Sequence, residues 1–259
     1  MTSAKRTIAQ ARKWIGYLEK KSNAQLDDFT ANAGDANYTC FGRDYGLNPA
    51  QWCGMFVSMV FVYEYGKETA KKLLCGGLHS YTPTGAKYFK NKNQYIKRGQ
   101  EKPLPGDVIF FYSKAKCRIG HVGIVIDVDD KKVYTIEGNT SGANRLVTNG
   151  GGVNQKSYLL TDPAIDGYGR VKYDEEEKNP EGNKVMGEFE VLKRGSKGQE
   201  VKTLQYVLLG RGYKLPKYGA DGDYGKETED AVKLFQKNKK LTVDGIAGKK
   251  TLDALYTQA

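Results

Sequence analysis

Residues 51–62 read QWCGMFVSMVFV and place the thiol of Cys53 at the start of one of the most apolar runs in the chain. The run predicts a helix over residues 53–66, because a proline-containing segment precedes it and Gly66 follows it. This helix is apolar nearly all round, so we expect it to be buried. A buried helix is a rigid mount, and a helix N-terminus favours a thiolate. Cys53 is therefore a candidate nucleophile rather than core filler.

The composition describes a globular protein of one large or two modest domains. The chain has 259 residues, of which 39% are hydrophobic, and no apolar run is long enough to cross a bilayer. We therefore expect no transmembrane helix and no insertion into a membrane. Residues 1–21 form a basic amphipathic pattern without the apolar core and cleavage site of a signal peptide, so we expect synthesis in the cytoplasm.

The net charge of +11 is distributed unevenly: residues 1–172 and 191–259 are basic, and residues 173–190 are acidic. This balance suits a polyanionic partner, such as nucleic acid or the anionic polymers of a cell wall. Nucleic acid is disfavoured, because the sequence has no stacking-aromatic or recognition-helix motif. The oligomeric state cannot be inferred from these features.

The cysteine and histidine content argues against a metal site. The four cysteines form no CxxC pair and the chain has only two histidines, so we expect neither zinc nor disulfides and no cofactor. Cys40, Cys75 and Cys117 are interpreted as packing residues.

The order of helix and strand signals predicts an α+β fold. Helices are expected over residues 4–20 and 53–66, and an antiparallel sheet packed on them is expected from four strands, over residues 107–112, 122–128, 133–137 and 169–173. The charged segment YDEEEKNPEGNK begins at residue 173 and cannot bury enough apolar surface to fold. It divides the chain into a catalytic domain (1–172), an acidic linker (173–190) and a small domain (191–259).

The small domain contains a near repeat. DGDYGKETEDA at residues 221–231 recurs as DGIAGKKTLDA at 244–254, and an apolar spacing over residues 201–208 precedes both. Three short helices joined by Asp-Gly turns are expected. With "LQ" at 204–205 and "FQ" at 235–236, the region resembles the peptidoglycan-binding-domain-1 family, which implies a cell-wall ligand. Tyr224 is a candidate wall contact, exposed by its turn position, or else a packing residue for its own helix.

A cysteine nucleophile needs a base, and only His79 and His121 are available. His79 lies in a predicted loop without a carboxylate or amide nearby. His121 opens a strand, and the next strand ends in IEGNT at 136–140. If the turn over residues 127–132 has an odd length, His121 faces Glu137 or Asn139 on one face of the sheet. The set then has the members of a papain-type site.

Four motifs in order extend this interpretation: WCGMFVS, PGDVIFF, GHVGIVI and IEGN. Together they resemble the CHAP domain, the cysteine- and histidine-dependent amidohydrolase/peptidase branch of the NlpC/P60 group, over about residues 30–172. The resemblance implies a papain-like fold and assigns a role to each of five residues: nucleophile Cys53, general base His121, imidazole-orienting Glu137, supporting Asn139, and Gln51 as a helper of the Cys53 N–H in an oxyanion hole.

The resemblance also bears on metal binding and on function. Some CHAP domains carry a calcium-binding acidic loop, but Asp35 and Asp44 stand too far apart for one here. The two modules together predict a peptidoglycan hydrolase, and specifically a phage-type endolysin that acts on Gram-positive walls after release, with a bacterial autolysin as a close variant. An N-acetylmuramoyl-L-alanine amidase is favoured by analogy. The alternatives are an endopeptidase that cuts stem or cross-bridge peptides and, from a different class, a non-catalytic wall-binding protein.

Overall fold

The computed structural model describes residues 1–29, 31–141, 150–174, 191–210 and 213–257. The helices of the first part are α1 (Ala4–Arg12), α2 (Cys40–Tyr45), α3 (Cys53–Tyr65), α4 (Lys67–Leu73) and α5 (Thr82–Asn91), with a single 3-10 turn, η1 (Lys114–Lys116). The strands are β1 (Tyr95–Lys97), β2 (Val108–Ser113), β3 (Arg118–Val128), β4 (Lys132–Thr140), β5 (Gly152–Leu159) and β6 (Ile165–Gly169). The last part contains α6 (Gln199–Gly210), α7 (Lys226–Asn238) and α8 (Lys249–Thr257).

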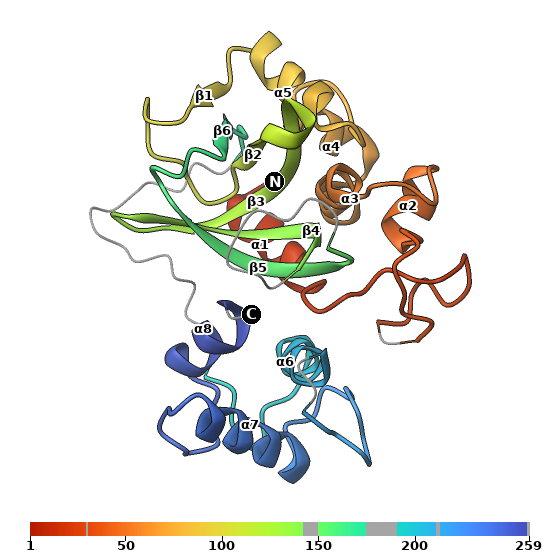
Figure 1. Cartoon of the computed structure of the whole chain (residues 1–259), viewed down its shortest axis with the longest axis vertical. Helices are drawn as coiled ribbons and strands as arrows, with labels where there is room; N and C mark the ends of the chain where they lie inside the picture. Colours follow the sequence, from red (N-terminus) through yellow and green to blue (C-terminus); the bar gives the residue numbers. More distant parts are fainter. Residues whose placement is uncertain (30, 142–149, 175–190, 211–212, 258–259) are drawn as a thin grey trace.

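The six strands form one sheet in the order β1-β6-β2-β3-β4-β5, with every neighbouring pair antiparallel. Helix α3 lies against β3 and β4 and is in contact with α1, α2 and α4 (Figure 1). The predicted α+β fold, with helices packed on an antiparallel sheet, is confirmed. None of the described helices is both long and apolar enough to cross a membrane.

Helix α3 is buried because its sequence offers no polar face. Its first nine residues are all buried, and Trp52, directly before it, stacks on Phe41 with ring centroids 5.6 Å apart. The sheet comes close to this helix at Gly138, where a Cβ atom would lie 2.5 Å from Cβ of Phe56. Glycine at this position therefore lets β4 pack directly on α3.

Several predicted element boundaries are wrong. The strand expected over 122–128 begins at Arg118, so His121 lies within β3 and does not open it, and the strand expected over 133–137 extends to Thr140. The helix expected over residues 4–20 ends at Arg12, because Gly16 has a positive φ of 91° and donates its N–H to the Val153 carbonyl of β5. The strand expected over 169–173 is β6, which ends at Gly169 where its partner Val108 begins β2. The prediction also missed α2, α4, α5, β1 and β5.

The last part of the chain is built on two equivalent turns, each clasped by a buried glutamine. Gln205 donates to Asp221 Oδ1 at 2.8 Å and to Thr228 Oγ1 at 2.9 Å, and its own oxygen accepts from the Gly222 N–H at 2.8 Å. These bonds fix the DGxxGxxT turn that leads into α7.

Gln236 repeats this pattern with the second turn. It donates to Asp244 Oδ1 at 2.7 Å and to Thr251 Oγ1 at 3.0 Å, and it accepts from the Gly245 N–H at 2.9 Å. The sequence repeat therefore encodes one local structure twice, and the predicted helical C-terminal domain is confirmed.

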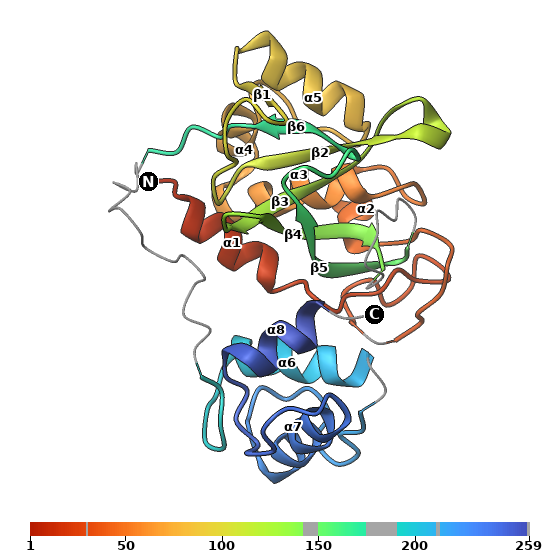
Figure 2. The ribbon, with the colours of Figure 1, turned by 60° about the vertical axis from the view of Figure 1, so that its left-hand side comes forward.

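The predicted linker begins two residues too early in structural terms. Tyr173 donates its hydroxyl to the Gly106 carbonyl at 2.9 Å, and Asp174 exchanges two hydrogen bonds with Thr2. Both residues contact the first domain. Residues 175–190, the rest of the predicted linker, lie outside the described residues. Beyond them, α8 lies against β5 (Figure 2).

Candidate active site

Cys53 is the first residue of α3 and is 3% exposed. No side chain caps this helix, because its N-cap residue is Trp52, whose indole N–H can only donate and does so to Glu19 Oε2 at 2.9 Å. The backbone N–H groups of the first turn are therefore not consumed by a side-chain cap. A thiol at this position lies in the positive end of the helix dipole, which favours its ionised form.

His121 provides the imidazole that faces this thiol. The ring is fully buried, and its Nε2 lies 2.9 Å from Glu137 Oε2. Its Nδ1 has no hydrogen-bond partner among the described residues, and the Cys53 side chain is one of the two groups whose interaction with the ring raises its pKa. Burial lowers the pKa of His121, but interactions with Cys53 and then Glu137 outweigh it and raise the pKa to about 9. Near neutral pH the imidazole is therefore protonated, with the thiol on one side and the carboxylate on the other.

Glu137 is itself held by three hydrogen bonds. Besides the imidazole, its Oε2 accepts from the Tyr158 hydroxyl at 3.1 Å, and its Oε1 accepts from Thr135 Oγ1 at 2.6 Å. Burial raises the pKa of Tyr158 well above its usual range, so this hydroxyl stays a donor. A buried carboxylate is tolerated only with such partners. Sequence reasoning missed both donors, although Thr135 could have been found, since it lies two positions before Glu137 on the same strand face.

Aromatic packing fixes the ring planes of this group. The Phe111 ring centroid lies 5.8 Å from that of His121 and 4.7 Å from that of Tyr158. Close approach of the strands also depends on Gly123, where a Cβ atom would lie 2.6 Å from Cγ of Glu137. The second glycine of the GHVGIVI motif is therefore explained by the room that the carboxylate needs.

The pairing of β3 with β4 differs from the predicted register next to the turn. Next to the turn Val128 pairs with Val133. If this register continued along the strands, it would be shifted by one residue from the register that places His121 and Glu137 on the same face. Further along, Val125 pairs with Thr135, so one extra residue, Ile126, is accommodated as a β-bulge. The expected odd-length turn is therefore wrong, and the bulge restores the expected register.

The bulge decides on which face Glu137 lies. With a regular ladder from the turn onward, Glu137 would stand opposite Ile124, whose side chain belongs to the core under α3. That register would bury a carboxylate among apolar groups, at a cost of several kcal/mol. With the bulge, Ile136 takes that position and Glu137 reaches His121.

The two alternatives for the third residue are now distinguished by their contacts. Asn139 is fully buried with a positive φ of 54°, its Nδ2 lies 3.5 Å from Asn37 Oδ1, and its Oδ1 has no partner among the described residues. Glu137, and not Asn139, bonds the imidazole. Gln51 is exposed, and its Oε1 accepts from Lys116 Nζ at 3.0 Å.

Several other sequence interpretations are corrected. The prediction that Tyr224 is exposed is wrong: the residue is fully buried and its hydroxyl donates to the Gly245 carbonyl at 2.9 Å, so it packs rather than contacting a wall ligand. Cys40 and Cys75 are buried as expected, but Cys117 is exposed. His79 lies in a loop as expected, is buried, and has no partner for either ring nitrogen among the described residues.

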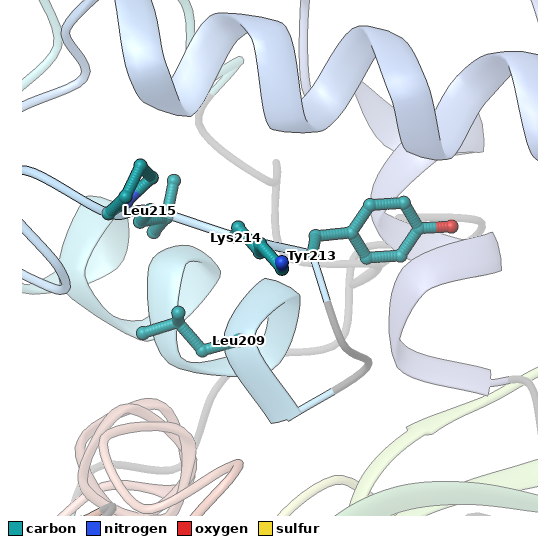
Figure 3. Close-up of a pocket in the computed structure, with 5 residues that line it drawn as sticks. Leu209, Tyr213, Lys214 and Leu215 are labelled. Carbon is teal, nitrogen blue, oxygen red and sulfur yellow. The ribbon is translucent and has the colours of Figure 1, made fainter.

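Two features outside this site bear on function: the metal-binding capacity of the described residues and a pocket near α6. Among those residues no group of three or more His, Cys, Asp or Glu could hold a metal ion. A pocket of about 330 Å³ lies at the end of α6, away from Cys53, and is lined by Leu209, Tyr213, Lys214, Leu215 and Pro216 (Figure 3). Its lining is mainly apolar, and Tyr213 packs on Phe235 of α7.

The site and its motifs match a known family. Residues 43–139, which hold Cys53, His121 and Glu137, match the CHAP domain. The chain contains a CHAP domain. Residues 197–255 match the peptidoglycan binding domain, so the chain carries both modules.

Three similar proteins extend the comparison. The N-acetylmuramoyl-L-alanine amidase CwlL and a probable N-acetylmuramoyl-L-alanine amidase, both of Bacillus licheniformis, are 52% and 51% identical over 65 residues, which is 25% of this chain and 18% of each relative. A solved fused Zn-dependent amidase/peptidase/peptidoglycan-binding domain-containing protein from Clostridium acetobutylicum ATCC 824 is 35% identical over 27% of this chain and 30% of that one, with a TM-score of 0.25.

These matches are short. The chain spans less than a fifth of the length of the curated relatives that it matches, and a 65-residue match is too short to include the whole CHAP domain at 43–139.

Proposed function

We propose that this chain is a peptidoglycan hydrolase that cleaves an amide bond by cysteine nucleophilic catalysis. The observation that carries the proposal is the buried relay from Cys53 through His121 to Glu137 at the N-terminus of α3, in a chain that also contains a peptidoglycan binding domain. A non-catalytic wall-binding protein would have no need for a buried, fully hydrogen-bonded carboxylate behind a histidine.

The geometry supports a two-step acyl transfer. His121 holds the proton of the Cys53 thiol, and the thiolate attacks the amide carbonyl while the carbonyl electron pair moves to oxygen. The resulting oxyanion is met by the Cys53 backbone N–H, with the Gln51 amide as a further proposed donor. His121 then protonates the leaving amine, the C–N bond breaks, and a thioester remains. Water attacks the thioester as His121 takes its proton, and the thiol is restored. Glu137, hydrogen-bonded to His121 Nε2, stabilises the imidazolium each time His121 carries the proton.

For the bond, we propose the amide between muramic acid and the first alanine, the cleavage of an N-acetylmuramoyl-L-alanine amidase. The choice follows the names of the two Bacillus licheniformis relatives, N-acetylmuramoyl-L-alanine amidases that match this chain over 65 residues, or 18% of their length. A glycosidic bond is disfavoured, because its hydrolysis normally uses two carboxylates and gives a thiol no task.

Mass spectrometry of purified Gram-positive walls after digestion tests both the function and the bond. New N-terminal alanine on sugar-free stem peptides, with no increase in reducing ends, is expected. New internal amino termini, with alanine still on muramic acid, would establish an endopeptidase instead. Intact walls after prolonged incubation with the full chain would leave only the wall-binding role.

We further propose that the C-terminal domain retains the enzyme on peptidoglycan and that its basic charge adds affinity for anionic wall polymers. The full-length Cys53→Ala variant is the suitable probe, because it cannot release the walls to which it binds. It should pellet with walls, and removal of their phosphate-containing polymers should weaken but not abolish this binding.

The order of a cysteine hydrolase domain and a wall-binding domain also favours a phage-type endolysin that acts after release from the cytoplasm. Expression inside a Gram-positive host tests this role. Cells should stay intact until the membrane is permeabilised and should then lyse, whereas lysis without permeabilisation would argue for an exported enzyme.

A further inference from the structure

The hairpin that joins β2 to β3 carries three cations beside the reactive thiol. Lys114 and Lys116 lie on η1, and Arg118 begins β3. Lys114 is exposed, and the other two are partly exposed. In the described part of the chain no ion pair is formed by any of them.

A hydrogen bond places this hairpin at the N-terminus of α3. Lys116 Nζ donates to Gln51 Oε1 at 3.0 Å, two residues before Cys53. Next to the same helix start lies the loop before α5, since a Cβ atom on Gly54 would come within 2.5 Å of the Ser80 carbonyl oxygen. The hairpin and this loop therefore border the thiol on one side.

A contact between Arg118 of the hairpin and Tyr81 of the loop before α5 connects these two segments. The Arg118 guanidinium lies over the Tyr81 ring, 4.7 Å from its centroid, and Tyr81 is 52% exposed. Beneath them Thr82 Oγ1 donates to the Ile119 carbonyl at 2.8 Å, which ties the start of α5 to the strand that carries His121. A guanidinium stacked on an aromatic ring is held in position while some of its N–H donors remain available. We call Lys116, Arg118 and Tyr81 the basic rim.

The surrounding sequence gives the basic rim no counter-charge of its own. Residues 69–100 and 108–126 contain neither aspartate nor glutamate. Cations on a border of a reactive site, without acidic neighbours along the chain, are suited to an anionic group of the substrate. The stem peptides of peptidoglycan carry free carboxylates next to the amide bonds that a hydrolase attacks.

We propose that the basic rim binds a free carboxylate of the wall peptide, and that the enzyme therefore prefers peptidoglycan whose stem carboxylates are not amidated. This inference rests on the proposed hydrolase function and deepens it. Lys116 supplies a point charge, Arg118 supplies a planar pair of donors, and Tyr81 holds the guanidinium and offers a surface for the peptide.

The test uses purified walls in two chemical forms. Walls are first stripped of phosphate-containing polymers, so that peptide carboxylates are the remaining anions. Half of the material is then amidated with carbodiimide and ammonia. Initial lysis rates of the full-length protein are measured on both forms. The wild type should be slowed about tenfold by amidation, as loss of a charge-assisted hydrogen-bond pair predicts.

Variants separate the basic rim from general charge effects. The double variant Lys116→Gln/Arg118→Gln should lyse unmodified walls about tenfold more slowly than the wild type and should lose most of its response to amidation. A charge-matched control, Lys72→Gln/Lys87→Gln on α4 and α5, should respond as the wild type does. Arg118→Lys should keep part of the preference, because it keeps the charge but not the planar donors.

Two results would overturn the inference while leaving the hydrolase proposal intact: equal lysis of both wall forms by the wild type, or an undiminished response to amidation in Lys116→Gln/Arg118→Gln. No lysis of either form by the wild type would overturn both.

Discussion

The two histidines of this chain are both buried, but their pKa values are shifted in opposite directions. His121 lies between a thiol and a carboxylate, which raise its pKa to about 9 against the effect of burial. His79 lies against Gly85 and 6.3 Å from the Phe110 ring centroid, and burial alone lowers its pKa to about 4. Near neutral pH the first ring holds a proton and the second does not.

Burial does not by itself make a histidine reactive. Both rings are removed from water, and what separates them is the presence of charged partners placed by strand pairing. Only the ring with a thiol on one side and a carboxylate on the other can move a proton during a reaction. The role of each group around the two rings can be tested by substitution.

The largest effect is expected from the reactive pair. Cys53→Ala and His121→Ala should each reduce wall lysis by roughly a thousandfold or more, with no further loss in the double variant, because nucleophile and base act as a unit. Turbidity loss of purified walls measures this, and pelleting with walls should be unchanged. His79→Gln is the matched control and should lyse at close to the wild-type rate at pH 7.5. Loss of lysis in His79→Gln alone would mean that the roles of the two histidines are reversed.

A smaller effect is expected from Glu137→Gln, which keeps the shape but removes the charge. Lysis should fall roughly a hundredfold. The carboxylate helps to raise the pKa of His121 to about 9, so its removal lowers that pKa, and the imidazolium is lost at a lower pH. The alkaline limb of the pH profile of kcat/KM should therefore move to lower pH. A limb that stays in place would show that Glu137 does not control the proton on His121.

The third prediction concerns His79 and stability rather than activity. Its pKa in the folded state is lowered below the unfolded value of about 6.5, so the unfolded state binds more protons between pH 6.5 and about 4. Stability should thus be lost as the pH falls through this window, by about 2 kcal/mol between pH 7.5 and pH 5. His79→Gln should lack this contribution.

Urea unfolding of both proteins at pH 7.5 and pH 5 measures the difference. Both tryptophans of the chain, Trp14 and Trp52, lie in the first domain, so their fluorescence reports on that domain alone. Asp107, whose pKa burial raises to about 6, acts in the opposite direction but is common to both proteins. The same pH dependence in wild type and His79→Gln would contradict the buried neutral ring.

The smallest effect on activity is expected from Tyr158, which contacts Glu137 but neither His121 nor Cys53 through a hydrogen bond. Tyr158→Phe removes one of three hydrogen bonds to Glu137 and should reduce kcat/KM roughly two- to fivefold. Tyr168→Phe is its control, because Tyr168 lies in the same apolar cluster and its hydroxyl has no partner among the described residues. Equal losses in both variants would indicate a packing effect and not support of the carboxylate.

The elements that sequence reasoning placed well are those with strong local signals. The apolar run after Cys53 and the glycine at residue 66 defined a helix that the structure places at Cys53–Tyr65. The order of strands likewise brought His121 near the end of the following strand. These features depend on residues close together in sequence.

The features that were missed depend on long-range packing. The polar strand β5 supplies Tyr158 to the site, and no apolar alternation marked it as a strand. The bulge at Ile126 follows from keeping a carboxylate out of the core, which requires knowledge of both faces of the sheet. The inward position of Tyr224 did have a signal, because its counterpart in the second repeat is Ala247, a small apolar residue that is also fully buried.

The bulge at Ile126 also separates the tip of its hairpin from the chemistry at its base. The surplus residue lies between the turn over residues 129–132 and the ladder that aligns His121 with Glu137, and it offsets the even length of that turn. Removing Ile126 would leave Val125 paired with Thr135 in a continuous ladder. A one-residue change in the length of the hairpin tip should therefore be absorbed at the bulge, where one strand has a residue to gain or lose, while the proton relay below it keeps its alignment.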